Sequence, residues 1–187
     1  MTPVPGRERL FVAVDVADEA RAALAEAVEP LQQRWPSLRW VRPESWHITL
    51  AFVGQVSPRR AAAVDAAAHC AAAGIRVFEV RLSGALGTFG RSVLWAGLAP
   101  SPPLEHVARG TRGALADRGI ATDDKPFHAH LTLARPPRRG RLPAEAKTVD
   151  WVGPTAGWDV GRLAVRRSEP APGGARYPSR FSAPLPH

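Results

Sequence analysis

The chain has 187 residues, of which 45 % are hydrophobic, and its formal net charge is +8 at pH 7. This length is sufficient for one domain with a core, or for one domain of two small lobes. The only cysteine, Cys70, excludes an internal disulfide framework and a thiolate metal site. Neither a secretory signal nor an apolar segment long enough to span a bilayer is present, so we expect a cytoplasmic protein without a membrane partner.

The positive charge comes almost entirely from arginine. Of the 25 basic residues, 23 are Arg and only Lys125 and Lys147 are lysines. Arginine binds phosphate with two parallel hydrogen bonds and stacks on bases, so this excess favours a polyanionic partner, nucleic acid above all. A coding bias toward arginine explains the same composition without any partner, and the charge therefore does not identify a substrate.

The elements expected in the first two thirds of the chain alternate between strands and helices. A buried strand is expected over 9–16, followed by a helix from residue 17 that ends near Pro30 or before Pro36. The pattern then predicts a strand over 40–53, a helix over 59–73 closed by Gly74, a strand over 75–82, a loop over 84–90, a strand over 92–98 and a helix over 102–118.

The last third contains shorter elements. We expect a strand over 127–134, a basic Pro-rich loop over 135–141, a strand over 160–166, a Gly/Pro loop over 171–175 and a short strand over 177–181. The two expected strands over 40–53 and 127–134 have similar surroundings. Each follows a helix and a loop, which hints at an internal duplication with two-fold pseudo-symmetry.

One short phrase occurs twice, once in each of these two strands. His-Ile-Thr-Leu begins at His47 and His-Leu-Thr-Leu at His130, 83 residues later. Residues two apart in a strand point to the same face, so His47 and Thr49 project together, as do His130 and Thr132. Either copy alone is common on a half-buried face, but a second copy in the same apolar context indicates a function.

Strands that lie side by side would combine these side chains into one pocket. Two imidazoles can act as general acid and general base in the same reaction, because one can be neutral and the other charged near neutral pH. Two hydroxyls can hold the oxygens of a phosphate. The residues alone do not decide which histidine takes which role.

With these motifs the chain resembles the two-histidine (2H) phosphoesterases, and within them the RNA 2′,3′-cyclic phosphodiesterases, also called 2′-5′ RNA ligases. The similar segments are RLFVAVDV, WVRPESWHITLAFVG, SVLWAGL, KPFHAHLTLAR and RLAVRRSE, followed by a Gly-rich loop and Tyr177. The resemblance implies an α+β fold with two pseudo-symmetric lobes, each an antiparallel sheet backed by helices, around a central cleft. Residues 1–187 then form a single bilobal domain.

The resemblance also implies an activity. His47 is then the acid and His130 the base in the metal-independent hydrolysis of RNA 2′,3′-cyclic phosphate ends to 2′-phosphomonoesters, with reversible 2′-5′ ligation as a second reaction. Thr49, Thr132 and Arg135 are expected to bind the substrate phosphate. The implied partner is RNA or an oligonucleotide with such an end. The resemblance implies neither a cofactor nor a metal ion, and we expect a monomer.

Three residues near the motifs have more than one interpretation. Phe11 and Trp46 are candidates for stacking on a base, but both are also typical core residues, and Trp46 points away from His47 in a strand. The family usually has proline before the second motif, where this chain has Ala129, and His128 precedes it. His128 shares a face with His130, and we expect a residue of the pocket rim or the surface rather than a metal ligand.

Two rival functions remain open at this point. A metal-dependent phosphohydrolase would use His128 and His130 as ligands and would lose activity in a chelator. An RNA-binding protein without turnover would bind RNA and leave a 2′,3′-cyclic nucleotide intact, although pure binding does not require two proton-transfer groups.

Overall fold

The computed structural model describes residues 6–171 and 174–187. The strands are β1 (Glu8–Asp15), β2 (Arg39–Trp40), β3 (His47–Val56), β4 (Phe78–Phe89), β5 (Val93–Leu98), β6 (His130–Arg135), β7 (Gly157–Val160), β8 (Arg162–Arg167), β9 (Glu169–Ala171), β10 (Gly174–Arg176) and β11 (Ser179–Pro184). The helices are α1 (Asp18–Arg34), α2 (Pro58–Ala73) and α3 (Pro102–Ala116), with short 3-10 turns η1 (Pro43–Ser45) and η2 (Ala144–Lys147).

Most of the strands form one curled antiparallel sheet. Its order is β11-β8-β1-β3-β6-β5-β4-β7, and β2 pairs with the far end of β6. The halves β11-β8-β1-β3 and β6-β5-β4-β7 meet at β3 and β6, which are joined through the single pair Ile48 and Leu131. The expected α+β fold with two antiparallel halves is therefore confirmed, and the two motif strands are neighbours.

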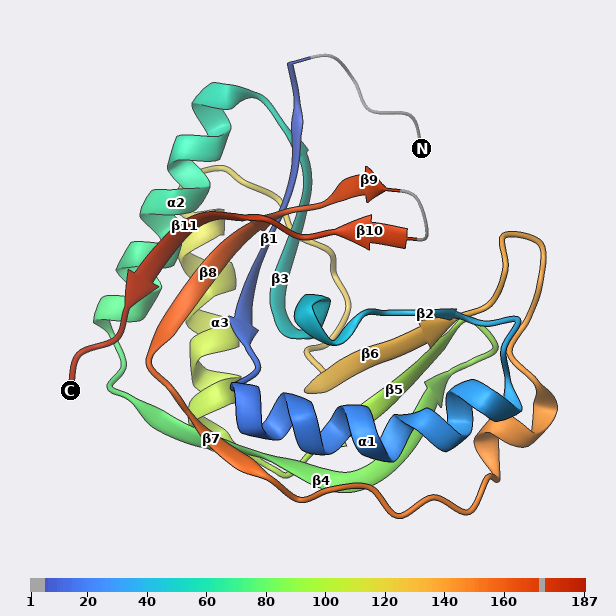
Figure 1. The fold of residues 1–187 in the computed structure, drawn as a ribbon. Coiled ribbons are helices and arrows are strands. Elements are labelled where there is room, and N and C mark those ends of the chain that lie inside the picture. The colour runs from blue at the N-terminus through green and yellow to red at the C-terminus, as the bar shows by residue number, and fades with distance from the viewer. Residues whose placement is uncertain (1–5, 172–173) are drawn as a thin grey trace.

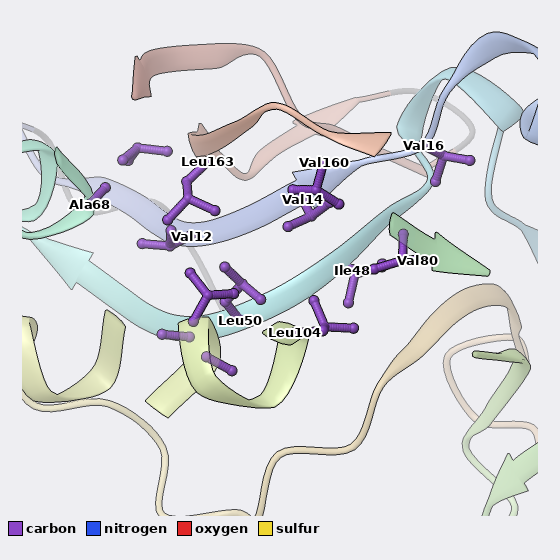
Figure 2. Packing of buried hydrophobic residues seen from close by; sticks show 14 of the residues in the cluster. Val12, Val14, Val16, Ile48, Leu50, Ala68, Val80, Leu104, Val160 and Leu163 are labelled. Atoms are coloured by element: carbon purple, nitrogen blue, oxygen red, sulfur yellow. The ribbon is translucent and has the colours of Figure 1, made fainter. Parts of the chain in front are cut away.

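Helices cover each half of the sheet. α2 and α3 pack against each other and against the β11-β8-β1-β3 half. α1 lies over β4 and β5 (Figure 1), and its Leu31 belongs to the same buried cluster as Leu94 of β5 and Ala134 of β6. Figure 2 shows the core beneath α2 and α3, where Ile48 and Leu50 of β3 meet Leu104 of α3. Leu131 and Leu133 of β6 are also fully buried. Because side chains alternate along a strand, this packing turns the histidines and threonines of both motifs to the other face.

The ends of the helices follow from their sequences. α2 begins at Pro58, whose missing N–H is not needed in a first turn, and ends before Gly74 as expected. α1 passes through Pro30 and ends at Arg34, before Pro36, so the second of the two expected ends is the observed one. In α3 the Ser101 hydroxyl accepts a bond from the Leu104 N–H and caps the first turn.

The expected loop over 84–90 is wrong, because β4 continues through it to Phe89. Gly84 has a φ of +74°, and the pairing of β4 with β5 shifts between Leu82 and Leu86. The glycine therefore marks a β-bulge inside a long strand, rather than a turn that ends it.

Other boundaries also differ from expectation. The segment over 40–53 divides into β2, η1 and β3, while β6 begins at His130 rather than at residue 127. Part of the expected loop over 171–175 forms the β9–β10 hairpin, and residues 172–173 lie outside the described residues. None of the helices in the described ranges is both long enough and apolar enough to cross a membrane.

Candidate active site

A single large cleft brings the two motifs together. Its volume is about 1780 Å³, and its lining includes His47, Thr49, His130 and Thr132. Ile48 opposite Leu131 fixes the antiparallel register, which places His47 across from Thr132 and Thr49 across from His130. A two-fold axis through the Ile48–Leu131 pair would exchange the two motifs, as the repeated phrase predicts.

The two imidazoles are held in the same way. Nδ1 of His47 lies 2.7 Å from the Ser45 carbonyl oxygen, and Nδ1 of His130 lies 2.7 Å from the His128 carbonyl oxygen. A carbonyl only accepts hydrogen bonds, so Nδ1 is the protonated nitrogen of each ring and Nε2 is left for the cleft. Each histidine is therefore presented through Nε2 with its tautomer fixed by the backbone two residues before it.

Burial makes both imidazoles harder to protonate in the free protein. Loss of solvation lowers the pKa of His47 to about 4; the Ser45 carbonyl and Asp15 raise it, while Arg166 and His130 lower it. Burial is also the main cause that lowers the pKa of His130, helped by the charges of His128 and Arg135 and opposed by the His128 carbonyl. Burial therefore favours the neutral form of both rings in the free protein, whereas the sequence suggests one neutral and one charged imidazole.

The surroundings of His47 are built by the C-terminal part of the chain. Asp15 lies opposite His47 in the β1–β3 ladder and accepts two bonds from Arg166, at 3.0 Å from Nε and 2.6 Å from Nη2. Nη1 of Arg166 donates to the Tyr177 carbonyl at 2.7 Å. The Tyr177 ring then stands edge-on to the His47 ring with 5.0 Å between centroids. Sequence reasoning missed the Asp15–Arg166 pair, because no local pattern connects residues 151 positions apart.

The proposed stacking residues lie in different places. Phe11 lines the cleft, but it is only 3 % exposed and packs against His47 with 4.6 Å between ring centroids. Trp46 is 2 % exposed and belongs to the main core cluster. As a candidate for base stacking Trp46 is therefore wrong, because its ring points away from the cleft into the core.

Positive charge surrounds the rest of the cleft. Among its described lining residues ten are cationic and four acidic; the cations are Arg7, Arg9, Arg39, Arg42, Arg112, Lys125, Arg135, Arg138, Arg167 and Arg176. Arg135 follows the second motif and lies opposite Arg39 in the β2–β6 pair. Such crowding of like charges is relieved by an anion, so the cleft attracts phosphate groups.

His128 reaches the cleft rim beside His130, with 5.9 Å between the ring centroids. Across the part of the chain that the structure describes, no three His, Cys, Asp or Glu side chains gather as a metal site requires. His128 instead contacts Phe89 and Trp95, with ring centroids 5.3 Å and 4.9 Å away. Neither aromatic residue was singled out from the sequence.

A nine-stranded curled sheet with two equivalent His-x-Thr strands in a cationic cleft defines a two-histidine phosphoesterase. Residues 14–95 match the family model described as LigT like Phosphoesterase. An RNA 2′,3′-cyclic phosphodiesterase of Thermus thermophilus is 33 % identical over 180 residues, which cover 90 % of this chain and 86 % of that protein. The chain thus belongs to the LigT-like family of 2H phosphoesterases.

Two further relatives agree. An RNA 2′,3′-cyclic phosphodiesterase of Geobacillus stearothermophilus is 34 % identical over 133 residues, which are 69 % of this chain but only 42 % of that longer protein. The crystal structure of Escherichia coli LigT complexed with 3′-AMP superimposes with a TM-score of 0.78 at 27 % identity, covering 96 % of this chain and 98 % of that one. The fold inferred from the motifs is therefore that of solved family members.

Proposed function

We propose that this protein hydrolyses 2′,3′-cyclic phosphate ends of RNA to 2′-phosphomonoesters without a metal ion. The observation that carries the proposal is the pair of equivalent imidazoles, each fixed through Nδ1 and lining one cationic cleft with a threonine. The relatives named above as RNA 2′,3′-cyclic phosphodiesterases support the substrate class.

In this proposal water attacks phosphorus in line with the bond to the ribose O3′. His130 takes the proton from the water, and His47 gives a proton to O3′ as that bond breaks. The product has a phosphate on O2′ and a free 3′-hydroxyl. When a 5′-hydroxyl of another strand replaces the water, the same steps give a 2′-5′ linkage.

Thr49 and Thr132 are assigned to the non-bridging phosphate oxygens, because each lies across the ladder from the histidine of the other motif. Arg135 is assigned to the same phosphate or to the next one along the strand. The negative charge of the substrate favours the charged form of an imidazole, so binding helps His47 to acquire its proton despite its low pKa in the free protein.

The test is incubation of the protein with a 2′,3′-cyclic nucleotide, with and without a chelator, followed by identification of the phosphomonoester. We expect the 2′-phosphate in both samples. The His69→Ala variant should keep the wild-type rate and serves as the control for substitutions of His47 and His130, since His69 is an exposed histidine of α2 outside the cleft. Activity lost in the chelator would identify a metal-dependent enzyme using His128 and His130, and RNA binding without any turnover would identify a binding protein.

A further inference from the structure

Each cleft imidazole has a phenylalanine ring against it, but only one of these rings is open. The centroid distances are similar, 4.6 Å for Phe11 and His47 and 4.8 Å for Phe89 and His130. Phe11 is 3 % exposed, and Tyr177 covers it edge-on at 5.4 Å. Phe89 is 36 % exposed and lines the cleft. The pseudo-symmetric site thus leaves an uncovered apolar ring on the His130 side.

Phe89 is part of an aromatic cluster, which we call the shelf and define as Phe89, Trp95 and His128. The ring centroids of Trp95 lie 5.5 Å from Phe89 and 4.9 Å from His128, and those of Phe89 and His128 are 5.3 Å apart. Phe89 and His128 face the cleft, while Trp95 supports them from β5. Apolar ring surface left in water beside a reacting group is unfavourable unless a ligand covers it.

The backbone is adapted to this cluster. Gly87 of β4 pairs directly with Trp95 of β5, and a Cβ atom at Gly87 would lie 2.2 Å from Cζ2 of the indole. The indole therefore lies across the glycine, in space that any larger residue would take. β4 continues past the bulge at Gly84, and its last residue, Phe89, lines the cleft.

We propose that the shelf stacks the base of the nucleotide whose 5′-hydroxyl attacks the cyclic phosphate, so that the cleft holds two RNA ends at once. This rests on the proposed function, in which His130 is the base. In-line displacement puts the attacking and leaving oxygens on opposite sides of phosphorus, so the shelf lies beside the attacking group. Water needs no aromatic surface, whereas a nucleoside does.

The reaction balances without a further reactant. The 5′-hydroxyl loses its proton to His130, a P–O5′ bond forms, the P–O3′ bond breaks, and His47 protonates O3′. The reverse reaction cleaves a 2′-5′ linkage to a 2′,3′-cyclic phosphate and a free 5′-hydroxyl. A cleft of about 1780 Å³ exceeds the 300–1,000 Å³ usual for one small ligand, which leaves room for both nucleotides.

The test compares two substrates, a 2′-5′-linked diadenosine and adenosine 2′,3′-cyclic phosphate. Phe89→Leu keeps an apolar side chain against His130 and removes the stacking ring. Loss of stacking corresponds to roughly 5- to 150-fold in affinity. We expect kcat/KM for the diadenosine to fall at least about fivefold, mainly through KM, with a loss below threefold for the cyclic nucleotide. Phe89→Trp should restore the diadenosine reaction.

Two further variants exclude indirect effects. Gly87→Ala leaves the cleft-lining residues unchanged and places a methyl group against Trp95, which supports Phe89 and His128. It should also weaken the diadenosine reaction more than the cyclic one. Val152→Ala shortens an apolar side chain that is 90 % exposed and outside the cleft, so both reactions should keep their rates.

Other results would overturn the inference in separate ways. Equal losses on both substrates from Phe89→Leu would mean that the shelf holds the base of the cyclic end itself. If Phe89→Leu lowers the rate on neither substrate, the shelf binds no base. The inference is also refuted if the wild-type protein opens the cyclic nucleotide but does not cleave the diadenosine. A wild-type protein inactive on both would refute the proposed function as well.

Discussion

The rate of cyclic phosphate hydrolysis should depend on pH in a way that the structure determines. Acid–base catalysis by two imidazoles needs one charged and one neutral ring, so kcat/KM follows a bell between their two pKa values in the free protein. Burial lowers the pKa of His47 to about 4 and also lowers that of His130 below 6.5. The bell should therefore lie on the acid side of neutrality.

The size of the effect follows from the two limbs. Above the higher pKa both rings are neutral and no acid is present, so kcat/KM falls tenfold for each pH unit. Because burial lowers the pKa of His130, this fall should begin at a lower pH than for an exposed histidine, and kcat/KM at pH 8 should lie well below the plateau. Below about pH 4 both rings are charged and no base remains.

The assay measures initial rates on a 2′,3′-cyclic nucleotide far below KM, from pH 4 to 9 at constant ionic strength, with circular dichroism as a control for unfolding. Proton NMR titration of His47 and His130 would give both pKa values directly. The profile of kcat should lie at higher pH than that of kcat/KM, because the bound phosphate favours a charged imidazole. A kcat/KM bell centred at or above pH 7 would refute the inference that burial governs these two rings.

Three other predictions concern single side chains. His47→Ala and His130→Ala should each lower kcat by roughly 10² or more with the fold intact, and near-wild-type turnover in either would contradict the two-histidine mechanism. Thr49→Ala and Thr132→Ala should each cost roughly ten- to hundredfold in kcat/KM, since one hydrogen bond to a charged oxygen contributes about 1.5–3 kcal/mol. Tyr177→Ala should raise the pKa of His47 in an NMR titration, because the ring that shields it is gone, while Tyr177→Phe should not; equal shifts in both variants would assign the effect to the hydroxyl instead.

The motif strands could be predicted because their signal is local. A period of two places His and Thr on one face and the aliphatic residues on the other, and the burial of Ile48, Leu50, Leu131 and Leu133 follows that pattern. The same rule places Trp46 on the face opposite His47, and its 2 % exposure agrees with that placement. Adjacency in sequence does not bring the Trp46 ring into the cleft, because neighbouring residues of an extended chain point to opposite faces.

The shelf could not be predicted, for a different reason. Phe89 lies between Gly84 and Gly90, a spacing that is typical of a loop, and a loop residue gives no expected direction for its side chain. Pairing of β4 with β5 supplies the hydrogen bonds that override the glycines, and those partners come from a strand whose register the sequence does not fix. The Gly87–Trp95 contact becomes visible only once that register is known.

A repeated motif produces two equal imidazoles, but the proposed displacement at phosphorus would give them opposite tasks. Within the motifs the equality is preserved, since both rings donate through Nδ1 to the carbonyl two residues before them. The difference comes from segments outside the repeat. Phe11 and Tyr177 pack against the ring of His47, and Arg166 donates to the Tyr177 carbonyl. On the side of His130, Phe89 is 36 % exposed and lines the cleft. The enclosed histidine suits a leaving oxygen that stays on the bound ribose, and the open one suits a nucleophile that must enter from outside, whether water or the end of a second strand.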